Sequence, residues 1–230
     1  MKLLTIDTST STCSVALTSD GELVAEYLVN LEKPHTGHLL EGVDTVLRGG
    51  GMTLGDIDGF GVALGPGSFT GLRVGVATVK GLALATGKQV AGFSSLAMLA
   101  MNLPMASYPV CPMFDARKME VYTALYECRE LPRAVVADCV LPPMEFLATL
   151  TGTTIFVGEG SHRYREVIEA ALGDRALFSP VTANTPRASN GALLADDMFL
   201  RDAIMPLAAI SPVYIRPSEA ELAKRQRERL

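Results

Sequence analysis

GFGVALGPGSFTGLRVGVATVKGLALAT, residues 59–86, predicts three elements in succession: a buried strand at Gly59–Leu64, a glycine-rich turn at Gly65–Thr70 and a helix at Gly71–Thr86. The helix carries only two ionised side chains, Arg73 and Lys80, and no Asp or Glu occurs between residues 59 and 114. A helix that is apolar around most of its circumference is buried on more than one side. We therefore expect one side to pack within the chain and the other to contact another protein.

The segments around this stretch predict two similar series of strands and helices. In the first half the other predicted elements are strands at Lys2–Asp7, Cys13–Thr18, Leu23–Leu31 and Gln89–Phe93, a helix at Gly37–Arg48, and a helix that Ser94 caps. The second half predicts strands at Val110–Phe114, Glu120–Tyr126, Arg133–Leu141 and Thr154–Val157, and helices at Pro142–Leu150, Tyr164–Leu172 and Asn190–Arg201. This internal repeat favours an α/β protein of two like-folded lobes, at residues 1–104 and 105–217, followed by a charged helix at 218–230.

Composition excludes several classes of function. The chain has 230 residues, is 48% hydrophobic and carries a net charge of −5, so it has no overall electrostatic footprint for nucleic acid. RNA would then be reached through a partner. No apolar signal segment opens the sequence and no membrane helix is predicted, so we expect a cytoplasmic protein without membrane contact. The cysteines lack CxxC pairing, which favours free thiols over disulfides or zinc.

The glycine-rich turn has a catalytic and a structural interpretation. A strand, glycines and a helix N-terminus can cradle phosphate. However, Thr70 stands where the dinucleotide motif has its third glycine, no acid follows about 20 residues later, and no GK[ST] motif occurs. Ser68 does not lie in a G-x-S-x-G elbow either, so it is predicted to cap the helix rather than to act as a nucleophile. We prefer a tight structural turn.

Asp7 and the histidines are the remaining candidates for chemistry. Asp7 ends the first strand and enters the hydroxyl-rich turn DTSTST, where an acid could hold Mg²⁺ beside a phosphate. An ordinary polar turn explains the same residues, and the sequence leaves both interpretations open. His35 and His38 have helical spacing, with His162 far along the chain, but no acid or cysteine cluster accompanies them. We therefore predict no metal site.

The helix at Gly71–Thr86 has two stripes that bear on partner binding. Small residues at helical spacing form one stripe: Gly71, Gly75, Thr78, Gly81 and Ala85. Apolar residues form the other: Leu72, Val76, Val79 and Ala83. Small residues let two helices approach closely. Packing on the chain's own sheet explains one stripe, so the sequence predicts a docking surface for the other.

Four separated blocks, in order, resemble the TsaB (YeaZ) family: LLTIDTSTSTCSVAL, GPGSFTGLRVGVATVKGLALA, MFDARKMEVYTALYE and PVYIRP. The resemblance runs from the start of the chain to about Pro217. It implies the actin-like ATPase (ASKHA) architecture and a non-catalytic subunit. Members of this family partner a catalytic subunit, TsaD, and a small ATPase, TsaE, in transferring threonylcarbamoyl to the adenosine beside the anticodon of tRNA.

The resemblance also implies which residues have a role. The HxxxH metal motif of TsaD is replaced here by His35-Thr36-Gly37-His38, one residue short, and the nucleotide loops of the family are degenerate. Asp7, Thr8, Gly158 and Gly160 would then be a vestigial nucleotide site, and the chain would need no cofactor, although the complex could use ATP and Mg²⁺. The expected partner interface, which would also form a homodimer when the chain is alone, comprises Leu39, Leu40, Val43, Val46, Leu47, Leu72, Gly75, Val76, Val79 and Ala83.

Two alternatives stay open from sequence. The actin-like resemblance, Asp7 and the glycine loops are also compatible with a protein that binds or hydrolyses ATP itself. A peptidase that acts on TsaD is a third hypothesis, for which no Ser/His/Asp set or zinc motif can be assembled. The basic residues of the final helix could contact tRNA, although a solvated helix face is more common.

Overall fold

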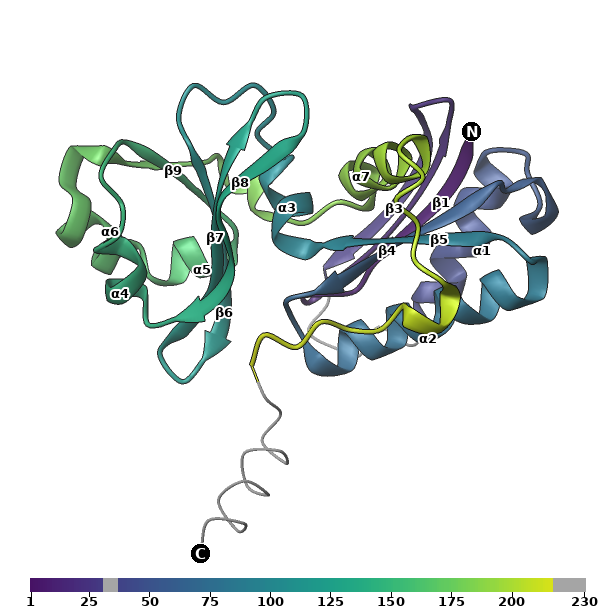
Figure 1. The fold of residues 1–230 in the computed structure, drawn as a ribbon, viewed down its shortest axis with the longest axis horizontal. Helices are drawn as coiled ribbons and strands as arrows, with labels where there is room; N and C mark the ends of the chain where they lie inside the picture. Colours follow the sequence, from purple (N-terminus) through teal and green to yellow (C-terminus); the bar gives the residue numbers. More distant parts are fainter. Residues whose placement is uncertain (31–36, 217–230) are drawn as a thin grey trace, which may run out of the picture.

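The computed structural model describes residues 1–30 and 37–216, which form two lobes, each built on a five-stranded sheet (Figure 1). His35 and the charged helix predicted at 218–230 lie outside the described residues.

The first sheet has the strand order β3-β2-β1-β4-β5. Its strands are β1 (Lys2–Asp7), β2 (Thr12–Ser19), β3 (Glu22–Asn30), β4 (Gly59–Gly65) and β5 (Gln89–Ser94). The first three form an antiparallel meander, whereas β4 runs parallel to β1 and β5 runs parallel to β4. Helices α1 (Leu39–Gly49) and α2 (Phe69–Thr86) pack on one face of this sheet, and α7 (Ala188–Leu200) packs on the other.

The second sheet repeats this topology. Its strands are β6 (Val110–Arg117), β7 (Glu120–Cys128), β8 (Pro132–Leu141), β9 (Thr154–Val157) and β10 (Ala176–Phe178). The order β8-β7-β6-β9-β10 matches that of the first sheet strand for strand, with a meander followed by two parallel strands. The predicted pair of like-folded lobes is therefore confirmed. Its helices are α4 (Pro143–Leu147), α5 (Glu159–Arg163) and α6 (Arg165–Leu172).

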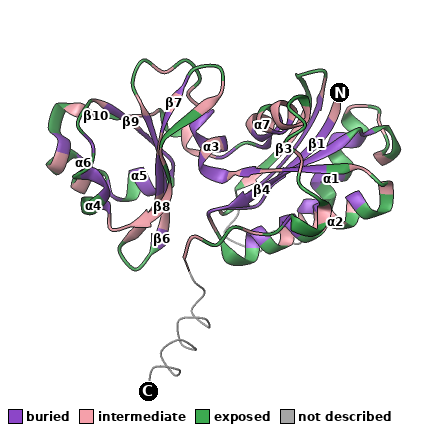
Figure 2. Cartoon of the chain, in the orientation of Figure 1, coloured by how far each residue is buried: buried purple, intermediate pink, exposed green. Residues whose placement is uncertain are grey.

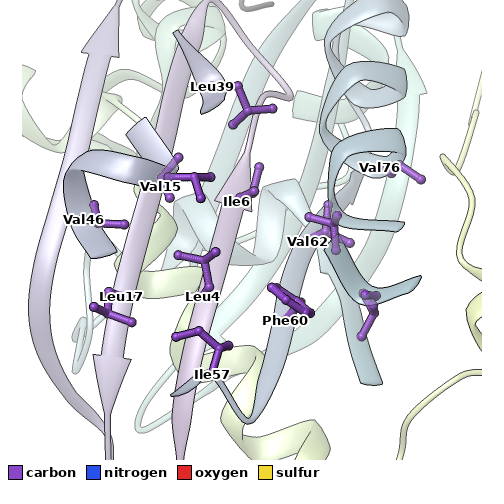
Figure 3. Packing of buried hydrophobic residues seen from close by; sticks show 14 of the residues in the cluster. Leu4, Ile6, Val15, Leu17, Leu39, Val46, Ile57, Phe60, Val62 and Val76 are labelled. Atoms are coloured by element: carbon purple, nitrogen blue, oxygen red, sulfur yellow. The ribbon is translucent and has the colours of Figure 1, made fainter. Parts of the chain in front are cut away.

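The core of the first lobe lies between its sheet and the α1–α2 layer (Figure 3). Leu4 and Ile6 of β1 point into this layer because alternate residues of a strand face the same side. Val46 of α1 and Val76 of α2 come from the helices above them, and both are buried. Leu3, on the other face of β1, packs in the separate cluster under α7.

The packing of the lobes does not follow the predicted boundary between residues 104 and 105. Helix α7 belongs to the second half of the sequence, yet it covers the free face of the first sheet. The carboxylate of Glu26 on β3, which is nearly buried, accepts hydrogen bonds from Arg187 and from the amide and hydroxyl of Ser189. Ala188 donates its amide to the Ser14 hydroxyl at 2.8 Å. These bonds hold the start of α7 on the first lobe.

Helix α3 (Ser95–Ala100) lies between the two lobes (Figure 1). Ser94 caps it, as predicted, by accepting bonds from the amides of Leu96 and Ala97. The same hydroxyl donates to Asp138 of β8 at 2.5 Å, and Asp138 also accepts a bond from Tyr126. One serine therefore starts the helix and ties the first lobe to the second sheet.

Several boundaries differ from those predicted. Helix α2 begins at Phe69, two residues before the predicted start, because the Ser68 hydroxyl accepts the Gly71 amide and brings the intervening turn into the helix. Helix α4 ends at Leu147, before the predicted end at Leu150. Strand β10 and helix α5 are too short to show a periodic pattern and are absent from the prediction.

The turn between β1 and β2 packs directly on the start of α2. The Ser68 amide donates to the Ser9 carbonyl at 2.6 Å, and the Thr8 hydroxyl donates to the Gly71 carbonyl at 2.8 Å. A Cβ at Gly71 would lie 2.0 Å from the Thr8 carbonyl oxygen, and one at Gly67 would lie 2.2 Å from that of Ser9. Glycine is required here because two backbones come into contact.

This contact predicts opposite effects for two glycine substitutions in α2. Alanine favours helix by about 1 kcal/mol over glycine. Gly71→Ala should nevertheless lower the free energy of unfolding by about 1–3 kcal/mol, because the new Cβ collides with backbone. Gly81→Ala is the matched control: nothing lies within 4 Å of its added Cβ, so it should raise stability by about 0.5–1 kcal/mol. Urea denaturation measures both, and equal effects would contradict the proposed packing.

Candidate functional site

Asp7 is a fully buried carboxyl at the end of β1. Its Oδ1 accepts the Ser9 amide at 2.9 Å, whereas Oδ2 makes no hydrogen bond to any described residue. Burial raises the pKa of Asp7 from 3.8 to about 6, and the favourable effect of the neighbouring Ser9 and Thr8 groups offsets the burial only in part. The site thus retains one carboxylate oxygen that could accept a proton or a ligand.

The surroundings of Asp7 do not fit a magnesium-bound phosphate, the ligand that the actin-like resemblance would suggest at this position. The amides of Ser68 and Gly71 are used inside the protein, and the Thr8 hydroxyl is donated to the Gly71 carbonyl. The Ser9 carbonyl lies over the glycine turn, where a phosphate would otherwise approach the backbone. The preferred interpretation of the glycines as a tight structural turn agrees with this geometry.

Gly158 and Gly160 lie at a corresponding position in the second lobe, where Gly158 joins β9 to α5 and Gly160 is in the first turn of α5. Gly158 has a φ of +104°, and a Cβ there would lie 2.4 Å from the Met113 carbonyl oxygen. A Cβ at Gly160 would lie 2.9 Å from the same backbone. The Gly158 amide donates to Asn184 at 2.7 Å. Close packing against the Met113 backbone therefore explains why both positions are glycine. That these glycines form a vestigial nucleotide site with Asp7 and Thr8 stays a prediction.

The described histidines have separate surroundings. Nδ1 of His38, just before α1, lies 3.4 Å from the Glu41 carboxylate, while His162 is exposed on α5. Across residues 1–30 and 37–216, no three His, Cys, Asp or Glu side chains gather as metal ligands would. All four cysteines have free thiols, and burial raises the pKa of Cys111 to about 12.

The structure places the residues chosen for a partner interface mainly in the core. Leu40 is 60% exposed, but all the others are buried: Leu39, Val43, Val46, Leu47, Leu72, Gly75, Val76, Val79 and Ala83. Their regular spacing arises because they form the faces of α1 and α2 that cover the sheet (Figure 2). The side chains that a partner could touch on these helices are therefore different ones.

The outward side of α2 consists of exposed residues without an acid. We call it the α2 face: Phe69, Thr70, Arg73, Ala77, Gly81, Leu84 and Ala85. With half-buried Val74 and Thr78, its first half lines a shallow groove. The predicted small-residue stripe is thus divided, since Gly71 and Gly75 face the Thr8 side chain and backbone whereas Gly81 and Ala85 face outward. Among the described helices, none is long and apolar enough to cross a membrane.

The C-terminal segment, residues 206–216, forms a strap that runs beside α2 toward the second lobe (Figure 1). The Val213 amide donates to the Leu64 carbonyl at 2.8 Å, and Lys80 donates to the Ile210 carbonyl at 3.1 Å. At its end, Arg216 pairs with Glu120 at 2.6 Å and donates to the Ala116 carbonyl. The strap therefore joins α2 to the β6–β7 hairpin.

Phe69 and Arg73, at the start of the α2 face, form a cluster with Tyr214 of the strap. The sequence analysis did not predict this cluster. The Arg73 guanidinium lies 3.7 Å from the centroid of the Phe69 ring, and its Nε donates to the Tyr214 hydroxyl at 2.9 Å. The rings of Phe69 and Tyr214 are 4.6 Å apart. Tyr214 lies within the block PVYIRP, but no sequence pattern connects that block to a helix 141 residues earlier.

The raised pKa of Asp7 predicts how stability depends on pH. Below about pH 4 both folded and unfolded chains hold the Asp7 proton; between about pH 4 and 6 the folded chain holds more, so unfolding becomes easier as pH rises. The Asp7→Asn side chain does not titrate, so the stability of this variant lacks the pH dependence that Asp7 causes. The stability of the variant minus that of the natural chain should therefore rise by about 2–3 kcal/mol from pH 4 to 7. Urea denaturation across this range measures it, and a difference independent of pH would contradict the prediction.

The sequence matches the family model described as TsaD: tRNA N6-adenosine threonylcarbamoyltransferase over residues 29–224. Two curated relatives match nearly the whole chain. The tRNA threonylcarbamoyladenosine biosynthesis protein TsaB of Bacillus subtilis is 32% identical over 225 residues, 96% of both chains. The protein of the same name from Escherichia coli is 31% identical over 230 residues, again 96% of both.

Solved structures agree with these relatives. YeaZ from Pseudomonas aeruginosa superimposes with a TM-score of 0.80 at 30% identity, covering 93% of this chain and 99% of that one. The ethanolamine utilization protein EutJ from Carboxydothermus hydrogenoformans, at 13% identity, covers 84% of this chain and 90% of its own with a TM-score of 0.54. That likeness concerns the fold alone, and the two repeated five-stranded sheets agree with the actin-like architecture that the sequence resemblance implies. By sequence along almost its whole length and by structure, this chain belongs to the TsaB (YeaZ) family.

Proposed function

We propose that this chain is a non-catalytic subunit that binds and activates a TsaD-type catalytic subunit in the transfer of threonylcarbamoyl to the adenosine beside the anticodon of tRNA. The names of its TsaB relatives supply the pathway. Its match to the model of the transferase family supports pairing between two proteins of like fold. The observation that carries the proposal is the α2 face, an exposed helix surface without an acidic side chain.

The physical argument for docking at the α2 face rests on its side chains. Ala77, Gly81 and Ala85 are small and exposed, so a partner helix could approach the backbone of α2 closely. Leu84, 74% exposed, and Phe69, 37% exposed, supply apolar area at the two ends. A stable interface covers about 1,600 Å² in total, so neighbouring parts of α1 and the strap would contribute as well.

The remaining partners follow from the same proposal. The chain would form a homodimer through the α2 face when the catalytic subunit is absent, because the two proteins share a fold. A TsaE-type ATPase would join the complex, and tRNA would be bound mainly by the other subunits, since this chain has a net charge of −5. We place the complex in the cytoplasm, where tRNA is modified.

An ATP-binding protein of the actin-like type is the second candidate, and the open carboxylate oxygen of Asp7 favours it. The proposal expects no cofactor in this chain, so titration calorimetry with Mg-ATP on the isolated protein should show no binding at micromolar concentrations. A micromolar dissociation constant that Asp7→Ala abolishes would overturn the scaffold proposal. For the peptidase hypothesis, cleavage of the catalytic subunit on prolonged mixing would be the required result.

A substitution in the middle of the α2 face tests the proposed interface. Ala77→Arg places a long charged side chain on an exposed position, so the protein should fold normally while affinity for the TsaD-type subunit falls about 100-fold or more. Val76→Asp and Gly75→Arg, at two residues that the sequence analysis places in the interface, would instead disrupt the core because both positions are buried.

The matched control is Ala170→Arg, the same change at an exposed position of α6 in the second lobe. It should leave affinity unchanged. Gel filtration and interferometry with the purified catalytic subunit measure both variants, and circular dichroism checks that they fold. Equal binding by Ala77→Arg, Ala170→Arg and the natural chain would show that the partner docks elsewhere.

A further inference from the structure

We infer that Arg73 is a charge-selective anchor of the α2 face and that the catalytic partner presents a carboxylate to it, from an Asp or Glu set in an otherwise apolar surface. This inference rests on the proposed function and adds the chemistry that the partner must supply.

Arg73 is held in place before any partner arrives. Its guanidinium stacks on the Phe69 ring at 3.7 Å, and Nε donates to the Tyr214 hydroxyl at 2.9 Å. Phe69 is itself packed on Tyr214, with ring centroids 4.6 Å apart. These contacts use one edge and one face of the guanidinium. Its Nη groups, the pair that binds carboxylates in a bidentate manner, make no hydrogen bond within the described chain.

Most other described arginines already have an acidic partner. Such pairs join Arg48 to Asp44, Arg133 to Glu127, Arg163 to Asp115, Arg165 to Glu169, Arg187 to Glu26, Arg201 to Asp197 and Arg216 to Glu120. No described carboxylate lies within ion-pair distance of Arg73, and the sequence has no acid from residue 59 to 114. Arg73 is therefore a fixed cation whose counter-charge the described chain does not provide.

Covering Arg73 without a counter-charge would be unfavourable. The groove beside it is lined by Phe69, Thr70, Val74, Ala77 and Thr78, none of them charged. A partner that buries this groove must also remove water from the guanidinium, and an unpaired charge away from water is strongly unfavourable. A carboxylate opposite Arg73 turns this cost into selectivity, because a partner that lacks the acid, a second copy of the α2 face included, binds more weakly.

A protein carboxylate fits this surface better than an RNA phosphate does. Binding of a phosphate backbone uses several cations along a groove. Lys80 is the other cation of α2, but it is half-buried and donates to the Ile210 carbonyl in the strap. A single stacked arginine surrounded by small and apolar side chains has the composition of a protein–protein contact, in which Arg and aromatic residues dominate the binding energy.

The test is a series of variants measured for binding to the purified TsaD-type subunit. Arg73→Gln should weaken binding about 10-fold and Arg73→Glu about 100-fold or more. Tyr214→Phe keeps the arginine but removes its hydroxyl partner, so it should weaken binding about 3-fold. Arg129→Glu, the same charge reversal at an exposed position of the second lobe, is the control and should bind like the natural chain.

The salt dependence separates a charge contact from a steric one. Affinity of the natural chain should fall between 50 and 500 mM NaCl (about 10-fold), and the Arg73→Gln variant should lose most of this dependence because it has no charge to screen. Arg73 is exposed, so its variants should fold like the natural chain. Circular dichroism checks that they do.

The outcomes separate the inference from the function on which it rests. If the natural chain binds the catalytic subunit and the Arg73 variants bind equally well, the anchor is refuted while the proposed function stands. If the natural chain does not bind at all, the proposed function fails instead. A loss confined to self-association, or to binding of tRNA by the assembled complex, would identify a different occupant and overturn the inference as well.

Discussion

The backbone contact between the β1–β2 turn and the start of α2 determines how the first lobe is assembled. The amide of Ser68 meets the carbonyl of Ser9 at 2.6 Å, and the missing Cβ of Gly71 leaves room for the Thr8 carbonyl. This contact fixes the angle at which α2 leaves the sheet. Its buried stripe can then cover β1 and β4 while the opposite stripe remains outside. The glycines that resemble a phosphate loop thus position a helix.

A similar close packing of backbone on glycine occurs in the second lobe, where the backbone of Met113 and Phe114 lies against Gly158 and Gly160. Two connections prevent the lobes from being independent. Helix α7 returns to cover the first sheet, and the strap fastens α2 to the β6–β7 hairpin through Arg216. The α2 face therefore lies on a helix that is braced from the sheet side and from the strap, a rigid surface of the kind that favours tight docking.

The succession of strands and helices along the chain and its repeat could be predicted from sequence because they depend on local patterns. Alternation in β1–β3 and the caps at Ser68 and Ser94 are visible within a few residues. The interface residues could not be chosen this way, since an apolar stripe such as Leu72 and Val76 looks the same whether it faces its own sheet or a partner. The Arg73–Tyr214 contact spans 141 residues and depends on the path of the strap, which no local pattern encodes.

The central claim is that this chain activates a catalytic subunit without carrying out chemistry itself. It is tested most directly by the rate of threonylcarbamoyl transfer to tRNA by the TsaD-type subunit, with its ATPase and its donor supplied, in the presence and absence of this chain. The account predicts little transfer without the chain, a large increase on adding it in equimolar amount, and no transfer by the chain alone. An equal rate with and without it, or transfer by the isolated chain, would contradict the account.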